Sequence, residues 1–127
     1  MNSAKHIITW FDIPVTDMDR AVTFYSAILE VELQQMTFSN GLRISVFSAE
    51  EGAVTGALSC FPEHYIPAKA GSLVYINGNP DLQKILDRIE PAGGKILMPK
   101  SLISEHWGHM ALFEDTEGNR VALHSNH

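Results

Sequence analysis

Apolar and polar positions follow two periods along the chain, one typical of short strands and one typical of helices. Residues 6–15 are mostly apolar or β-branched, with Pro14 near the end of the run, which predicts a first strand. A helix is expected over 16–29, with Thr16 or Asp17 as its N-cap. Its apolar residues recur every three or four positions, so one face of this helix should pack on a sheet: Ala21, Val22, Tyr25, Ile28 and Leu29.

The rest of the first half predicts strands. Three apolar runs, 31–38, 41–48 and 53–61, have strand length and strand-forming residues. They are separated by residues 39–41 and 49–52, which are rich in turn-forming side chains. The first half is therefore expected to fold in the order β-α-β-β-β.

The second half repeats this order after a linker. Residues 62–70 contain two prolines and little periodicity. A strand is expected over 72–78 and a helix over 79–94, with Asn79 as cap, Pro80 in the first turn and two glycines at the end. Three further strands are expected at 95–98, 109–115 and 120–125, the last two joined by the turn at 116–119.

This repeat of about 60 residues predicts one α+β domain over 1–127. Module 1 is expected over about 5–61, the linker over about 62–70 and module 2 over about 71–127. A single module would leave sheet edges and an apolar face open, so the two modules should pair, and a homodimer is expected as well.

Composition excludes several classes of protein. A chain of 127 residues with 45% hydrophobic content can bury an ordinary core. The formal charge of −6, with no basic run, argues against nucleic-acid binding. The sequence contains no apolar run of membrane-spanning length and no signal-peptide pattern at its start, so a cytoplasmic protein without membrane partners is expected. The single cysteine, Cys60, is interpreted as a small buried hydrophobe rather than a nucleophile.

Three motifs carry a resemblance to a known family. "IPVTDMDRAVTFYSAIL" opens the first module, "AGGKIL" follows the second helix and "FEDTEGNRVALH" closes the repeat. Together with the duplicated βαβββ order, they resemble the vicinal oxygen chelate superfamily, which includes glyoxalase I, bleomycin-resistance proteins and extradiol dioxygenases. The resemblance implies a curved mixed sheet that forms a cup with the helices outside. It also implies metal ligands on the first and last strand of each module.

The residues at these implied ligand positions cannot bind a metal. They are Trp10, Gly56 or its neighbour, Leu73 or Val74, and Ala122. Divalent ions need carboxylate oxygen, imidazole nitrogen or thiolate, and none of these side chains supplies one. We therefore expect no cofactor, with a divalent metal bound only if displaced ligands hold it.

Polar side chains beside these positions are the candidates for chemistry. Residues two apart in a strand share a face, so Asp12 should accompany Trp10, and His124 should accompany Ala122. Asp12 and His124 are candidate proton-transfer groups, and Tyr75 is a candidate donor to an oxyanion. Each has a structural alternative: Tyr75 as a core aromatic, His124 as a partly exposed residue, and Asp12 as the ion-pair partner of Arg20, Arg43 or Arg120.

The candidate ligand-binding residues surround the implied cup: Trp10, Gly56, Leu58, Leu73, Trp107, Arg120 and Ala122. The segment 104–112 is expected to be a lid that supplies Trp107, an ordinary surface loop, or a metal site of His106 and His109. In the linker, His64 and Tyr65 are expected to be structural or to contact a second subunit.

Two functions remain open on the sequence. The first is a glyoxalase-related protein that binds a small apolar or carbonyl-containing molecule, as a lyase, isomerase or dioxygenase-like relative without the usual metal site. The alternative is a non-catalytic protein that sequesters a drug or metabolite, as the resemblance to bleomycin-resistance proteins suggests. Perturbed acid-base groups and turnover would favour the first, whereas aromatic walls alone suffice for the second.

Overall fold

A computed structural model describes residues 5–127. Residues 1–4, which belong to the N-terminal segment considered as a signal peptide, lie outside the described residues. The predicted order β-α-β-β-β occurs twice. Module 1 contains β1 (Asp12–Pro14), α1 (Met18–Leu29), β2 (Leu33–Thr37), β3 (Arg43–Phe47) and β4 (Ala57–Cys60). Module 2 contains β5 (Tyr75–Asn77), α2 (Gln83–Ile89), β6 (Lys95–Ser104), β7 (Gly108–Glu114) and β8 (Arg120–Ser125).

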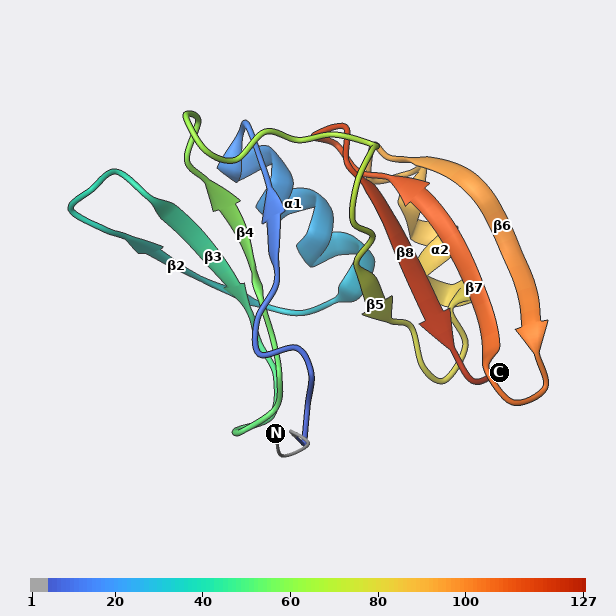
Figure 1. Ribbon diagram of the computed structural model, residues 1–127. Coiled ribbons are helices and arrows are strands. Elements are labelled where there is room, and N and C mark those ends of the chain that lie inside the picture. Colours follow the sequence, from blue (N-terminus) through green and yellow to red (C-terminus); the bar gives the residue numbers. More distant parts are fainter. Residues whose placement is uncertain (1–4) are drawn as a thin grey trace.

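Each module forms its own four-stranded mixed sheet (Figure 1). The strand orders are β1-β4-β3-β2 and β5-β8-β7-β6, so the two sheets have the same topology. β1 is parallel to β4, and β5 is parallel to β8. Asp12 pairs with Ala57 in the first sheet, and Tyr75 pairs with Ala122 in the second. The α+β fold is thus confirmed, and its two open sheets are consistent with a cup.

The helix ends show one correct and one incorrect prediction. Asp17 caps α1, and its carboxylate accepts a hydrogen bond from the backbone N–H of Arg20. The second helix is shorter than expected and begins after Leu82, so Asn79 is not its cap. The side chain of Asn79 instead accepts a hydrogen bond from the backbone N–H of Asn126, which ties this loop to the C-terminal segment.

Two strands also differ in length from the sequence pattern. β1 has three residues, so Trp10 precedes the strand. β6 continues to Ser104 and pairs with β7 along most of its length. Residues 105–107 are therefore a tight turn of the β6–β7 hairpin and not a long loop.

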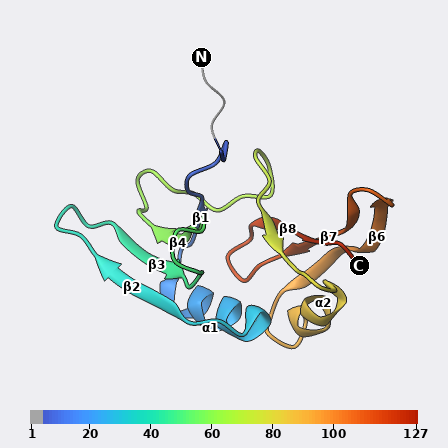
Figure 2. The same ribbon diagram turned by 90° about the horizontal axis from the view of Figure 1, so that it is seen from below.

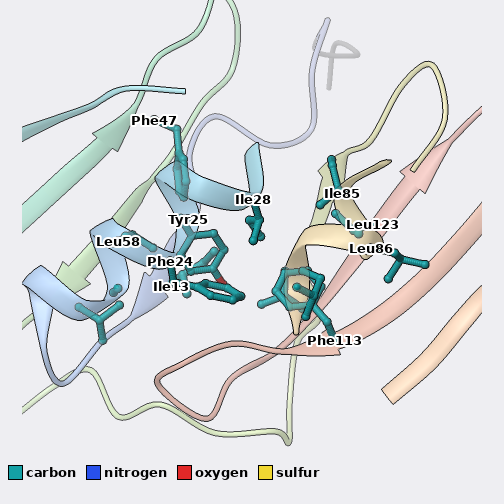
Figure 3. Packing of buried hydrophobic residues seen from close by; sticks show 14 of the residues in the cluster. Ile13, Phe24, Tyr25, Ile28, Phe47, Leu58, Ile85, Leu86, Phe113 and Leu123 are labelled. Atoms are coloured by element: carbon teal, nitrogen blue, oxygen red, sulfur yellow. The ribbon is translucent and has the colours of Figure 1, made fainter. Parts of the chain in front are cut away.

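The two modules share one hydrophobic core. α1 and α2 lie side by side on the same side of the two sheets (Figure 2). Their buried faces and the helix-side residues of both sheets form a continuous cluster (Figure 3), which includes Ile13, Phe24, Tyr25, Ile28, Phe47, Leu58, Ile85, Leu86, Phe113 and Leu123. Because side chains from both modules fill it, neither module would retain this core alone.

A polar turn of module 2 fastens the start of α1. We call residues 115–119, between β7 and β8, the intermodule clamp. The carboxylate of Glu117 accepts hydrogen bonds from the backbone N–H groups of Thr16 and Asp17 at 2.8 and 2.7 Å and from the guanidinium of Arg20 at 2.7 Å. The buried hydroxyl of Tyr25 donates to Asp115 at 2.7 Å. The clamp thus joins residues about 100 positions apart in the chain.

The clamp also changes acid-base properties. Burial raises the pKa of Glu117, but the hydrogen bonds from Arg20 and from the N–H groups of Asp17 and Thr16 outweigh burial and hold that pKa below its usual 4.5. Burial, followed by the charge of Asp115, raises the pKa of Tyr25 well above its usual value. Glu117 is therefore ionised and Tyr25 neutral near pH 7.

Within residues 5–127, neither helix combines the length and the hydropathy that crossing a membrane requires.

Candidate functional site

A cavity lies between the two modules. We call it the intermodule groove; its volume is about 760 Å³, within the range of pockets that hold small organic molecules. Module 1 contributes the segment before β1, the end of α1 and the β3–β4 loop, and module 2 contributes β5, the β5–α2 loop and α2. β1 and β5 are the inner edge strands of their sheets, so the groove follows the seam where the two sheets end.

The walls of the intermodule groove are mainly apolar and aromatic. They include Ile8, Trp10, Phe11, Leu29, Val31, Phe47, Val54, Leu73, Tyr75, Ile76 and Ile85. Trp10 is 43% exposed and Tyr75 51% exposed, so both present aromatic surface to an incoming molecule. The structure thus brings three of the predicted ligand-binding and catalytic candidates, Trp10, Leu73 and Tyr75, to one cavity.

Charged side chains lie at the α2 end of the groove. Arg88 donates to the carbonyl of Ile28 at 3.0 Å and pairs with Glu30 at 3.1 Å. Asp81 pairs with Lys100 at 2.8 Å. Arg88 and Asp81 are thus occupied by structural contacts, whereas Lys84, which also lines the groove, takes part in none of the ion pairs found in residues 5–127. The apolar walls provide most of the surface for recognition.

Asp12 is held by hydrogen-bond donors and not by an arginine. The indole N–H of Trp10 donates to its Oδ1 at 3.0 Å, and the hydroxyl of Ser59 donates to the same oxygen at 2.7 Å. The charge of Asp12, then partial burial and a hydrogen bond to Asp12, raises the pKa of Tyr65. We call Trp10, Asp12, Ser59 and Tyr65 the Asp12 cluster.

The ion-pair alternative for Asp12 is wrong within the described residues. Arg20 pairs with Glu117, and Arg120 donates through Nη2 to the carbonyl of Gly71 at 2.9 Å. Neither arginine, nor Arg43, forms an ion pair with Asp12 in residues 5–127.

A second, smaller pocket of about 240 Å³ brings Asp12 and Arg120 to one cavity. It lies between β1, the start of β8 and the linker that crosses from one module to the other. The linker is fastened there: the N–H of Ala68 donates to Asn119, and its carbonyl accepts from the N–H of Arg120. Asp12 and Arg120 were expected in one cup with Trp10 and Tyr75, but they line this smaller pocket and not the intermodule groove.

His124 and Trp107 lie together but apart from both cavities. The Nε2 of His124 forms a hydrogen bond with the backbone carbonyl of Trp107. Trp107 is 64% exposed in the β6–β7 turn, with the ring of His106 against it. Neither His124 nor Trp107 lines either of the two cavities described.

Two predicted ligand-binding residues of module 1 lie on the helix side of the sheet. A Cβ atom on Gly56 would lie 2.3 Å from the carbonyl oxygen of Phe11, so glycine permits the close approach of the segment before β1. Leu58 is fully buried in the core beside Ile13. Neither residue lines either cavity.

In module 2, Ala122 is fully buried opposite Tyr75, whose hydroxyl lies 4.0 Å from the sulfur of Met110. The implied ligand positions thus carry Trp10, Gly56, Leu73 and Ala122, whose side chains do not fit a divalent ion. Within residues 5–127, His, Cys, Asp and Glu side chains do not form a group of three or more that could hold a metal. Asp12, His124, His106 and His109, the candidates for displaced ligands, therefore do not form such a group within these residues.

Sequence reasoning missed two members of the Asp12 cluster. Ser59 lies in an apolar run, and only the register of β1 against β4, in which Pro14 pairs with Ser59, brings it near Asp12. Tyr65 was expected to be structural or to contact a second subunit. The linker prolines around it indicated a crossing segment, but no local pattern shows which strand such a segment crosses.

Comparisons with known proteins agree with this architecture. The profile of the Glyoxalase/Bleomycin resistance protein/Dioxygenase superfamily matches residues 7–123. A glyoxylase-like domain-containing protein of Didymella fabae is 29% identical over 122 residues, which cover 91% of each chain. The antibiotic-binding protein TnmS3 from Streptomyces sp. CB03234 has a similar structure, with a TM-score of 0.65 and 25% identity over 98% of each chain.

A mutant of glyoxalase I from Zea mays has a similar fold, with a TM-score of 0.72 and 23% identity. The match covers 92% of this chain and 46% of the maize chain, so the protein spans about half the length of that enzyme. The duplicated topology, the matched profile and these relatives agree: the chain belongs to the Glyoxalase/Bleomycin resistance protein/Dioxygenase superfamily.

Proposed function

We propose that this protein binds a small, largely apolar molecule in the intermodule groove and that it does so without a metal at the family's ligand positions. The observation that carries the proposal is the groove itself, about 760 Å³ in volume and walled by aromatic and aliphatic side chains from both modules. Burial of apolar ligand surface against such walls supplies the main driving force for binding. A carbonyl-containing aromatic compound fits this class of ligand.

Sequestration is favoured over catalysis by the surroundings of Asp12. A general base needs a free lone pair directed at the proton it removes. Here Oδ1 of Asp12 accepts from Trp10 and Ser59, and Asp12 does not line the intermodule groove, so its carboxylate is not directed at a molecule bound there. The other two catalytic candidates, Tyr75 and His124, lie in different places, one in the groove and one beside the β6–β7 turn. The similarity to the antibiotic-binding protein TnmS3 also supports sequestration.

The fluorescent probe 8-anilinonaphthalene-1-sulfonate tests the groove directly. We expect wild-type protein, in buffer containing EDTA, to bind about one probe molecule per chain by isothermal titration calorimetry. Val54→Asn should weaken binding about tenfold, because it places an amide on the apolar wall. Ile7→Asn is the control, since Ile7 is a highly exposed apolar residue that does not line the groove and lies outside β2 and β6.

Equal affinities of wild type and Val54→Asn for the probe would contradict binding in the intermodule groove. Binding that requires added nickel, zinc, manganese or ferrous iron would contradict its metal-free part.

A homodimer is a further part of this proposal. β2 and β6 are the outer edge strands of the two sheets. Exposed apolar side chains gather on β6, where they are Ile96, Leu97, Leu102 and Ile103, and β2 adds Met36. Such a pattern on an edge strand commonly marks a surface covered by another chain. Sedimentation equilibrium would give the mass of the particle, and a single chain at all concentrations would contradict the dimer.

A further inference from the structure

Two side chains of opposite charge line the smaller pocket without pairing with each other. Asp12 approaches from β1 and Arg120 from the start of β8. The ion pairs among residues 5–127 involve other cations, namely Arg20, Lys69, Arg88 and Lys100. Opposite charges that border one cavity but do not touch can each bind a complementary group of a third molecule.

Arg120 offers a donor that the protein leaves unused. Its Nη2 donates to the carbonyl of Gly71 at 2.9 Å. Its Nε is buried and has no hydrogen-bond partner within residues 5–127. The guanidinium carries five N–H donors, and the contact with Gly71 uses one of them, so other donors of the same group can reach an acceptor in the pocket. A carboxylate is the acceptor that best matches a guanidinium.

Asp12 offers the complementary acceptor. Trp10 and Ser59 both donate to Oδ1, which fixes the orientation of the carboxylate. The pocket therefore presents a fixed anion that can accept from an ammonium group, while Arg120 can donate to a carboxylate.

The rest of the pocket is small and apolar. Its volume of about 240 Å³ equals the space of about eight water molecules at ~30 Å³ each, so it suits a molecule of similar heavy-atom count. Apart from the polar groups of Ser72 and Asn119, its walls are aliphatic: Ile13, Pro14, Ile66, Ala68, Ala70, Val74 and Val121. The side chain of Asn119 is occupied, because it donates to Pro14 and Asp115 and accepts from Ala68.

We propose that the smaller pocket is a second binding site, separate from the intermodule groove, for a small zwitterion: a free α-amino acid with an apolar side chain. Its carboxylate binds Arg120, its ammonium group binds Asp12, and its side chain packs against the aliphatic wall beneath the linker. The site does not depend on the function proposed for the groove.

L-Leucine and two analogues test this charge pairing by isothermal titration calorimetry. 4-Methylpentanoate keeps the carboxylate and lacks the ammonium group, and 3-methylbutylamine keeps the ammonium group and lacks the carboxylate. We expect L-leucine to bind, and each analogue to bind about tenfold more weakly, because each loses one charged hydrogen bond. No binding of L-leucine, or equal binding of all three compounds, would overturn the proposal.

Four variants locate the site. Arg120→Gln and Asp12→Asn should each weaken L-leucine binding about tenfold, whereas the exposed controls Arg43→Gln and Asp19→Asn should not. Arg120→Lys keeps the charge if Arg120→Gln is poorly folded by circular dichroism, and it should weaken binding less. Unchanged affinity in both pocket variants would overturn the assignment. Arg120→Gln should still bind 8-anilinonaphthalene-1-sulfonate, so failure of this site is distinguishable from failure of the groove.

Discussion

The two modules share a topology but use the same connection in opposite ways. In module 2, the turn between β7 and β8 is the five-residue intermodule clamp, whose side chains are nearly all committed to hydrogen bonds. In module 1, the corresponding connection between β3 and β4 is nine residues long. Its residues Ser48, Val54 and Thr55 line the intermodule groove. One copy of the repeat therefore holds the modules together, and the other leaves surface for a ligand.

The equivalent strands β1 and β5 of the two modules differ in the same manner. Asp12 and Tyr75 occupy equivalent registers, opposite Ala57 and Ala122. Asp12 is fixed by donors from its own module and the linker, whereas Tyr75 is 51% exposed on the groove. The two modules thus share a scaffold, but equivalent positions in it carry different side chains. Asp12 makes fixed polar contacts, whereas Tyr75 presents an aromatic surface to the groove.

Breaking the clamp should have the largest effect. Glu117→Gln removes the charge that Arg20 and two backbone N–H groups contact, on a side chain whose exposure is 0%. We expect the free energy of unfolding, measured with urea, to fall by about 2 kcal/mol. In the control Glu30→Gln, the loss should stay below ~1 kcal/mol, because the pair of Glu30 with Arg88 is exposed at 68% and 35%. Equal losses of unfolding free energy in the two variants would show that the buried contacts of Glu117 stabilise the fold no more than an exposed ion pair does.

Acid should weaken the clamp. The pKa of Glu117 in the folded protein lies below its usual 4.5. Between the folded and the unfolded pKa, the unfolded state therefore binds more protons than the folded state. The stabilisation is complete above about pH 4.5 and is lost as the pH falls through the folded pKa. The difference in unfolding free energy between wild type and Glu117→Gln should therefore shrink below pH 4.5. A constant difference would contradict the ionised clamp.

The smallest effect concerns the Asp12 cluster. The charge of Asp12 is the main cause of the raised pKa of Tyr65. Asp12→Asn should therefore move the titration of Tyr65 to lower pH, which ultraviolet absorbance of tyrosinate detects. Tyr65→Phe identifies the signal by removing it. An unchanged titration in Asp12→Asn would show that Tyr65 does not contact this carboxylate in solution.

The sequence predicted what depends on local periodicity. The stripe of Ala21, Tyr25 and Ile28 predicted α1, and these residues are buried as expected. The prediction failed where a side chain serves a distant partner. Asn79 is a residue type that commonly caps helices, but its side chain binds Asn126, and the second helix starts later than its sequence indicated.

The candidate site was predictable only in part for the same reason. Trp10, Leu73 and Tyr75 were identified from strand positions and do line one groove. Leu58 was expected in the same set, but the β1–β4 register places it beneath α1 in the core. Tyr65 lies 53 residues after Asp12, and its contact depends on the path of the linker, which has no periodic signal.

The two indole N–H signals in a ¹H–¹⁵N NMR spectrum test the central claim most directly, because Trp10 lines the groove and Trp107 does not. Wild-type protein would be titrated with 8-anilinonaphthalene-1-sulfonate in the presence of EDTA, with Trp107→Phe to assign the signals. We expect the Trp10 signal to shift and saturate at about one probe per chain, while the Trp107 signal stays in place. A saturating shift of Trp107 with an unmoved Trp10, or shifts that appear only after a divalent metal is added, would contradict metal-free binding in the intermodule groove.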